Sequence, residues 1–307
     1  MTIPAFERAT AVVTGAASGL GLALCRALAR RGVDKLVMAD VQAPALEVAG
    51  AELSASGVDV LPFRVDVSRA AEVEALGAAT SARFGAPHLV FNNAGVSAGG
   101  LVWESSARDW EWVLGVNLMG VALGVRVFTP MMLAAAAHDP GYRGRIVNVA
   151  SAAGLINAPN MGVYNVAKHA VVSLSETLYQ DLRLVGTQVG ASVVCPDFVR
   201  TAIADSARNR PAALADDRPP TRSQRLHRTM AAKAVGEAEL TPEAVAEEVL
   251  EAVGQGRFYV HPGGASHLAA VRNRLDDLLH GRDPSDPFAA RPETAGELQR
   301  LLRGGRR

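Results

Sequence analysis

The segment YNVAKHA, residues 164–170, places a tyrosine four positions before a lysine in a stretch with helical character. An i, i+4 spacing puts Tyr164 and Lys168 on one helical face. A phenol with an ordinary pKa of about 10 is a poor base at neutral pH, but a neighbouring ammonium lowers that pKa. Such a tyrosine could give a proton to a carbonyl oxygen or take one from an alcohol. The alternatives are a tyrosine packed on a lysine stem and two solvated surface residues.

A glycine-rich stretch, TGAASGLG at residues 14–21, joins an apolar run to a helical segment. Glycines at 15, 19 and 21 allow a tight turn, and they let backbone N–H groups approach a pyrophosphate at a helix N-terminus. Ordinary turns often produce such a glycine pattern. The strand before it and the helix after it are the context that a dinucleotide site requires.

An acidic residue, Asp40, ends the second apolar run, 19 residues beyond Gly21. A carboxylate at this place can accept hydrogen bonds from an adenosine ribose, and it repels a 2′-phosphate. Neither Ala17 nor Ser18 supplies the cation that NADP would favour. We therefore expect NAD in preference to NADP, the alternative being that Asp40 is an ordinary turn residue.

The elements that must position these residues follow a regular alternation. Strand-length apolar runs cover residues 10–15, 35–40, 60–67, 88–95, 145–151, 190–196 and 257–262, and helical segments such as 21–32, 45–57 and 70–85 separate them. Strands that are apolar on both faces and alternate with helices indicate a parallel sheet covered on each side. The sequence predicts an α/β protein with one doubly wound Rossmann-type sheet.

The chain is predicted to form one domain over residues 1–265, with a lid at about 201–239. The Pro-, Arg- and Ala-rich part of this lid, 207–228, suggests a flexible insertion over the carboxyl edge of the sheet. Thr241 and Pro242 then mark the start of another helix. We expect residues 266–307 to form a partly disordered extension, in which 293–303 could be a short helix.

The composition excludes several classes of protein. The 307 residues include 31 basic and 31 acidic side chains, and this balance argues against a nucleic-acid partner. Two cysteines are too few for a disulfide framework, so we expect a reducing cytoplasmic location. The most apolar window, 116–137, contains Asn117, Arg126 and Pro130 and favours a buried helix over a membrane span. No signal peptide, membrane partner or metal site is expected.

Taken together, the motifs closely resemble those of the short-chain dehydrogenase/reductase family in its compact single-domain form. The matching stretches are TGAASGLG at 14–21, VDV at 65–67, NNAG at 92–95, VNLMG at 116–120, VASAAG at 149–154 and Tyr-x-x-x-Lys at 164–168. They occur in the family's order and spacing from Thr14 to about Thr201, roughly three-fifths of the chain. Each motif alone is weak, and the ordered set carries the resemblance.

The resemblance implies a role for each of four residues. Tyr164 would be the general acid/base, and Lys168 would lower its pKa and hold the nicotinamide ribose. Ser151 would hydrogen-bond the substrate oxygen, and Asn117 would anchor a water molecule in a proton relay. Without the family, Ser151 is more simply a helix N-cap and Asn117 a residue that bonds a helix break.

The resemblance also implies a set of cofactor contacts. Asp66 and Val67 would contact adenine, and the remaining contacts would lie along the groove that ends at the nicotinamide. Independently of the family, Asn92 is more simply a structural residue that bonds turn backbone. The full expected set is Gly15, Ser18, Gly19, Leu20, Gly21, Asp40, Asp66, Val67, Asn93, Ala94, Gly95, Tyr164, Lys168, Pro196, Val199 and Thr201. Hydride chemistry would belong to the cofactor.

One departure from the family pattern occurs in CPDFVRT, residues 195–201, where Asp197 stands in place of the usual glycine. A carboxylate that pointed toward a nicotinamide would favour the oxidised ring. We expect instead that Asp197 faces solvent or caps a turn.

The substrate is expected to be a hydrophobic secondary alcohol or its ketone, aromatic or alicyclic, because the positions that flank the site are apolar or small. These positions are Val96, Ala98, Leu101, Ala153, Leu155, Ile156, Met161 and Phe198. NRP at 209–211 and RFYVHP at 257–262 also resemble bacterial aryl-alcohol Cα-dehydrogenases of the family. The alternatives are a 3-ketoacyl-thioester reductase, which would use NADPH, and a catalytically silent dinucleotide-sensing protein. The apolar segments 116–137 and 164–186 suggest a homodimer or homotetramer.

Overall fold

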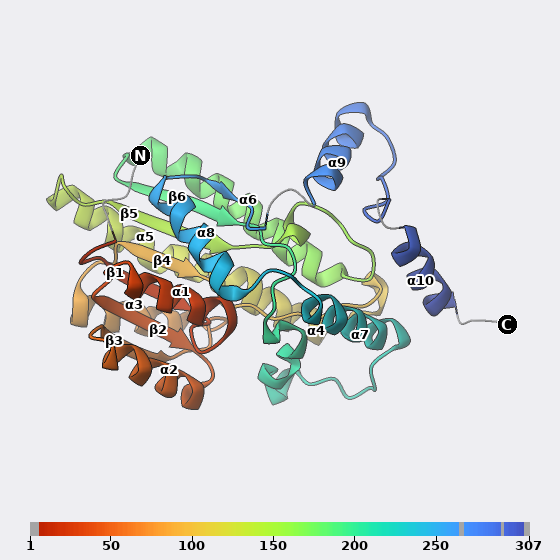
Figure 1. Ribbon diagram of the computed structural model, residues 1–307, viewed down its shortest axis with the longest axis horizontal. Helices are drawn as coiled ribbons and strands as arrows, with labels where there is room; N and C mark the ends of the chain where they lie inside the picture. The colour runs from red at the N-terminus through yellow and green to blue at the C-terminus, as the bar shows by residue number, and fades with distance from the viewer. Residues whose placement is uncertain (1–5, 264–266, 290–291, 304–307) are drawn as a thin grey trace.

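A computed structural model describes residues 6–263, 267–289 and 292–303 of the chain. Its centre is a parallel sheet of seven strands in the order β3-β2-β1-β4-β5-β6-β7, which confirms the predicted doubly wound fold (Figure 1). The strands are β1 (Thr10–Thr14), β2 (Lys35–Asp40), β3 (Asp59–Arg64), β4 (Leu89–Asn92), β5 (Gly144–Val149), β6 (Val189–Val194) and β7 (Tyr259–Val260). Each apolar run in the sequence forms one of these strands.

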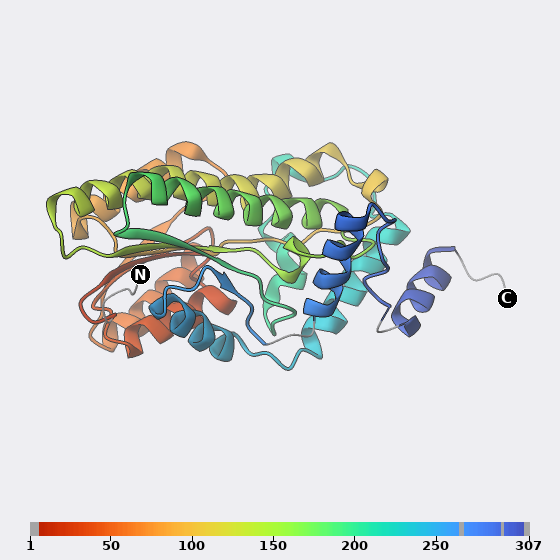
Figure 2. The same ribbon diagram turned by 90° about the horizontal axis from the view of Figure 1, so that it is seen from above.

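Helices cover both faces of the sheet, so the domain has three layers (Figure 2). One face carries α1 (Gly19–Arg30), α2 (Ala43–Ala55) and α8 (Pro242–Gly254), and the other carries α3 (Ala70–Phe84), α5 (Gly120–His138) and α6 (Gly162–Val185). Because neighbouring parallel strands need a crossover connection, alternating strands and helices in the sequence become alternating layers in space.

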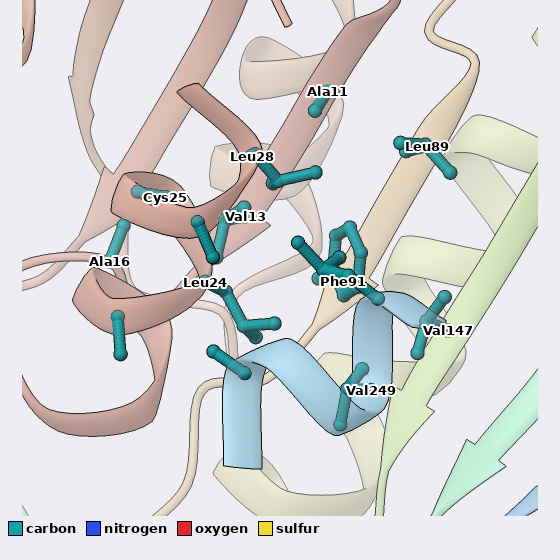
Figure 3. Close-up of a cluster of buried hydrophobic side chains, with 14 of the residues drawn as sticks. Ala11, Val13, Ala16, Leu24, Cys25, Leu28, Leu89, Phe91, Val147 and Val249 are labelled. Atoms are coloured by element: carbon teal, nitrogen blue, oxygen red, sulfur yellow. The ribbon is translucent and has the colours of Figure 1, made fainter. Parts of the chain in front are cut away.

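The core under α1 and α8 is made of aliphatic side chains with one aromatic ring (Figure 3). Leu24 and Leu28 of α1 pack toward Val13 and Phe91 of the sheet, and all four side chains are fully buried. Cys25 is a buried free thiol in the same cluster. Apolar burial of this extent is the main stabilising contribution in a domain of this size.

The most apolar stretch, Ala107–His138, is long enough to cross a membrane by composition alone. In the structure it comprises α4 (Ala107–Leu114), the π-helical turn η2 (Gly115–Met119) and α5. Leu123, Phe128 and Met132 of α5 are buried against the sheet. The sequence predicted a buried helix here, and these side chains pack on the sheet, while 28% of the most apolar window is buried.

The lid segment is more regular than the sequence suggested. It contains the 3₁₀ turns η4 (Ala202–Asn209) and η5 (Ala212–Leu214) and the helix α7 (Arg222–Gly236). We expected a flexible insertion here, but Thr221 and Gln224 form a capping box that begins α7. The lid lies over the carboxyl end of the sheet, next to α4 (Figure 1).

The C-terminal extension contains two helices in its described residues, α9 (Leu268–His280) and α10 (Pro292–Arg303). The short helix predicted for 293–303 is α10, whereas α9 was not identified from the sequence. Residues 264–266, 290–291 and 304–307 of the extension lie outside the described residues.

Candidate active site

The turn after β1 has the backbone of a dinucleotide site. Gly15 and Gly19 have φ of +67° and +54°, values that side-chain-bearing residues rarely adopt. A Cβ atom on Gly21 would lie 2.0 Å from the Gly15 carbonyl oxygen, so only glycine fits. Ser18 makes no side-chain cap at the start of α1, and no acid lies in its first turn. The helix N-terminus therefore presents unblocked N–H groups to an anion.

Asp40 lies at the carboxyl end of β2, beside this turn, and is 7% exposed. One carboxylate oxygen accepts a hydrogen bond from Ala17 N at 3.0 Å, and the other accepts one from Gln42 N at 2.9 Å. These bonds hold the negative charge at the rim of the cofactor groove. Arg64 also lines the groove, but it pairs with Glu72 at 2.8 Å.

The loop after β4 is fastened to the glycine turn by short polar contacts. Asn93 donates from its side chain to the Thr14 carbonyl at 2.8 Å, and Thr14 Oγ1 accepts from the backbone N–H groups of Asn93 and Ala94. Asn92 is buried, as expected of a structural residue, but its partner is the Asn148 side chain at 2.8 Å. The loop is thus rigid where a cofactor would lie.

Ser151 and Tyr164 meet at the carboxyl edge of β5 and β6. Ser151 precedes the 3₁₀ turn η3 (Ala152–Gly154), and its hydroxyl accepts a hydrogen bond from Ala153 N at 3.2 Å. Tyr164 lies in the first turn of α6 and is hydrogen-bonded to the Ser151 side chain. Ser151 therefore caps the 3₁₀ turn and contacts Tyr164 at the same time, so the two expected roles do not exclude each other.

Lys168 is one turn further along α6, with its Nζ 5.8 Å from the centre of the Tyr164 ring. Its ammonium donates to the Val149 carbonyl at 3.0 Å, and burial lowers its pKa to about 8. The expected lowering of the Tyr164 pKa is absent from this structure. Burial instead raises that pKa to about 12, and the Ser151 hydrogen bond opposes the rise. Desolvation of the phenolate is the larger of these two causes.

Asn117 belongs to the π-helical turn η2 and is fully buried. Its side-chain oxygen accepts from Val96 N, and its amide donates to the Val96 carbonyl, each at 2.8 Å. A Cβ atom added to Gly95 would lie 3.6 Å from Asn117 Oδ1 and 3.7 Å from Lys168 Nζ, so the two side chains approach the same point. Asn117 nevertheless lies behind the cavity wall.

A single cavity of about 1670 Å³ joins the glycine turn to the lid. Every predicted cofactor contact lines it, as do Ser151, Tyr164 and Lys168. Of the predicted apolar wall, Val96, Ala153, Ile156, Met161 and Phe198 line the cavity. Ala98, Leu101 and Leu155 do not.

The three misplaced wall residues were assigned from their nearness in sequence to active-site motifs. Ala98 packs under α4, Leu155 packs in the core beneath α6, and Leu101 N donates to Ser223 Oγ at 3.0 Å. Their neighbours turn them away from the cavity.

Parts of the cavity wall come from segments that the sequence did not connect with the site. Trp112 of α4, Leu214 and Met230 of the lid, and Phe288 and Leu298 of the C-terminal extension are apolar members of this wall. His227 of α7 adds a polar group. No local motif marks these residues, although the capping-box spacing of Thr221 and Gln224 is a signal that could have predicted the lid helix.

Asp197 lies between the predicted nicotinamide end and the extension. Its Oδ1 accepts a hydrogen bond from the adjacent Phe198 N at 2.9 Å. Its other oxygen is 4.0 Å from Nδ1 of the buried His267, so the side chain faces α9 as well as the cavity.

A family model described as short chain dehydrogenase matches residues 9–212. The chain therefore belongs to the short-chain dehydrogenase family, whose members are oxidoreductases that bind a nicotinamide dinucleotide. This assignment agrees with the strand order, the glycine turn and the Ser151–Tyr164–Lys168 arrangement.

Among solved structures, a short chain dehydrogenase/reductase from Burkholderia phymatum in complex with NAD is 48% identical, with a TM-score of 0.89. The match covers 94% of this chain and 100% of that one. A C alpha-dehydrogenase from Sphingobium sp. is 32% identical over 300 residues, which is 93% of this chain and 91% of that protein. A dehydrogenase from Sphingobium yanoikuyae in complex with NADPH shares the fold, at 24% identity and a TM-score of 0.67, over 89% of this chain and 94% of that one.

Proposed function

We propose that this protein interconverts a hydrophobic secondary alcohol and its ketone by hydride transfer, with NAD as the preferred cofactor. The hydrogen-bonded pair of Ser151 and Tyr164, in a largely apolar cavity continuous with a dinucleotide groove, carries the proposal. The likeness to a C alpha-dehydrogenase supports an aromatic or alicyclic substrate.

Each of the four residues has a role in this proposal. The bound dinucleotide supplies or accepts the hydride. Ser151 donates a hydrogen bond to the substrate oxygen, and Tyr164 passes a proton to that oxygen or removes it. An ordinary phenol is protonated at neutral pH, and burial raises the pKa of Tyr164 further, so the side chain is ready to act as an acid in ketone reduction. Lys168 holds the nicotinamide ribose and favours the phenolate electrostatically.

Asn117 would contribute its backbone, and not its side chain, to the proposed proton relay. Its amide is committed on both sides to Val96, so a water molecule of the proposed relay would bind its backbone carbonyl. A π-helical turn at this position supports the proposal, because such turns are frequent at functional sites.

Replacing the catalytic tyrosine tests the mechanism. Tyr164→Phe should lower turnover by about 100- to 10,000-fold, because a positioned acid/base group contributes that much. Dinucleotide binding, followed by NADH fluorescence, should remain. Near-normal turnover in the variant would exclude this mechanism, and dinucleotide binding without turnover in the unaltered protein would favour a sensing protein.

The cofactor preference is proposed from Asp40, whose buried carboxylate would repel a 2′-phosphate. The ratio of kcat/KM with NAD to that with NADP should favour NAD, and Asp40→Ala should reduce this ratio by tenfold or more. Equal use of both cofactors by the unaltered protein would contradict the assignment.

A panel of substrates tests the proposed substrate class. Aryl and alicyclic ketones should be turned over in preference to sugars and 3-ketoacyl thioesters. Turnover confined to a 3-ketoacyl thioester would favour the alternative reductase.

We also propose a cytoplasmic homodimer or homotetramer whose partner is a small molecule rather than nucleic acid or a membrane. Exposed Val166, Leu184 and Val185 on α6 support self-association. Light scattering on the purified protein would give its oligomeric state.

A further inference from the structure

Three polar side chains form a small group in the otherwise apolar wall of the cavity: Ser97, Asn160 and His227. Ser97 belongs to the loop after β4, Asn160 to the loop before α6, and His227 to the lid helix α7. Asn160 and His227 are 7% and 6% exposed. We refer to these three residues as the polar subsite.

The hydrogen bonds of His227 leave one ring nitrogen as an acceptor. A ring N–H of His227 bonds the Asn160 backbone carbonyl, and burial lowers the pKa of the imidazole to about 4. The ring is therefore neutral at physiological pH and carries one proton. Its Nε2 lies 3.4 Å from Ser97 Oγ, which is long for a hydrogen bond.

Asn160 contributes a second acceptor. Its Nδ2 donates to the Ser223 carbonyl at 3.2 Å, and this bond fixes the orientation of the amide. Its Oδ1 is buried without a hydrogen-bond partner. The residue has φ of +65°, a conformation that favours asparagine or glycine, and it lies four residues before Tyr164.

Two acceptors in a buried wall, one without a donor and one with a stretched contact, are unfavourable unless a ligand completes them. We propose that the polar subsite binds a hydroxyl group of the substrate, distinct from the hydroxyl or carbonyl at which hydride is transferred. This inference rests on the proposed function and narrows its substrate class to hydrophobic secondary alcohols that carry a second hydroxyl, as in an aryl diol or a phenol.

The acceptor character of the subsite selects the ligand group. A hydroxyl can donate to the unprotonated ring nitrogen of His227 or to Asn160 Oδ1 and can accept from Ser97 Oγ. A carboxylate or a second keto oxygen would only add another acceptor. An alkyl group would leave the buried acceptors unpaired.

Matched substrates test the inference on the full-length protein with NAD. The pairs are 1-phenylethanol with 1-(4-hydroxyphenyl)ethanol, and 1-phenylethanol with 1-phenylethane-1,2-diol. The readout is the ratio of kcat/KM for the hydroxylated alcohol to that for its partner. We expect at least one pair to give a ratio of about ten or more, because tenfold corresponds to about 1.4 kcal/mol, which is within the usual contribution of one hydrogen bond.

Two variants separate recognition from packing. His227→Phe keeps a flat ring and removes the acceptor, so the ratio should fall toward one. His227→Gln restores an acceptor and should recover part of the ratio. If His227→Phe does not fold, Asn160→Gly provides the same test, because glycine accepts the left-handed backbone and lacks Oδ1.

The outcomes distinguish this inference from the proposed function. If a variant lowered kcat/KM for both substrates of a pair by the same factor, the ratio would be unchanged. That result would show a purely structural role for the replaced residue and overturn the inference. Efficient turnover of 1-phenylethanol with a ratio near one in both pairs of the unaltered protein would also overturn it, while the proposed function stands. Absence of NAD-dependent turnover with every alcohol and ketone would overturn both.

Discussion

The sheet and the lid are held in place by different physical forces. Under α1, aliphatic side chains such as Leu24 and Leu28 are fully buried against the sheet. The lid is attached by polar contacts: Arg210 pairs with Asp109 of α4 at 2.7 Å, and their side chains are 13% and 6% exposed. The cofactor groove is thus built on the apolar core, whereas the lid is held by hydrogen bonds and ion pairs.

Several further bonds reinforce the attachment of the lid. Glu104 accepts a hydrogen bond from Thr221 Oγ1 at 2.6 Å and another from Ser223 Oγ. The Arg210 guanidinium also lies 5.2 Å from the centre of the Trp112 ring. The attachment therefore consists of a few discrete contacts.

This difference indicates how one chain can combine a fixed active site with a lid that opens. Apolar burial is non-directional and unites the sheet and its helices in one cooperative unit. Directed polar contacts can be lost together while the core remains, as in local unfolding. We expect the lid to open without disturbing Ser151 and Tyr164.

The largest difference between the lid and the sheet should appear when the buried Arg210–Asp109 ion pair is broken. Arg210→Met leaves Asp109 buried without its cation, a change that typically costs about 3–5 kcal/mol. The loss should appear as faster amide hydrogen exchange in α7 and a higher KM, with exchange in β1 and β4 unchanged.

Asp217→Asn is the matched control, because Asp217 pairs with Arg108 between the same two regions but is 86% exposed. This change should cost less than about 1 kcal/mol. Equal effects of the two variants would show that burial of the ion pair does not determine the attachment of the lid.

A core substitution should give the opposite pattern. Leu24→Ala removes a fully buried side chain, and such changes usually cost about 2–5 kcal/mol. The midpoint of denaturant unfolding should fall for the whole domain, because α1 is part of the cooperative core. If exchange increased only in the lid, the distinction between core and cover would be wrong.

Acidification should loosen the lid by a smaller and graded amount. The pKa of His227 falls from 6.5 to about 4 on burial, so the docked imidazole resists a proton that an exposed one accepts. Docking should be strongest above pH 6.5 and weaken toward pH 4, by up to about 1.4 kcal/mol per pH unit. Exchange in α7, corrected for its intrinsic pH dependence, measures this slope.

His227→Phe should remove the pH dependence of lid docking between pH 6.5 and 4.5. Glu104, whose pKa is lowered by the hydroxyls of Ser223 and Thr221, should then account for loosening at lower pH. A slope unchanged by the substitution would assign the acid sensitivity to another group.

The sheet and the cofactor edge could be predicted from local patterns. Each strand is an apolar run, and the turn at Gly15–Gly21 combines steric and electrostatic requirements that few other sequences meet. Parallel strands then bring their carboxyl ends to one edge, so Asp40, Ser151 and Thr201 line the same cavity although they are far apart in sequence.

The lid and the far wall of the cavity depend on contacts that no local pattern encodes. His227 is an isolated histidine in the sequence, and the role proposed for it follows only from its packing beside Ser97 and Asn160. The helix α9 lacks a side-chain N-cap, which explains why its start was not recognised. The direction of the Tyr164 pKa shift depends on the depth of burial, which the spacing of Tyr164 and Lys168 in the sequence does not indicate.

The closeness of α7 to the β4 loop depends on one missing methyl group. A Cβ atom on Gly99 would lie 2.3 Å from Nδ1 of His227 and 2.5 Å from two ring carbons. The methyl group of alanine at position 99 would push α7 away from the β4 loop without altering any charge. A change of one carbon atom would therefore alter how closely the lid helix packs on the β4 loop, giving natural variation a simple route to a different cavity shape.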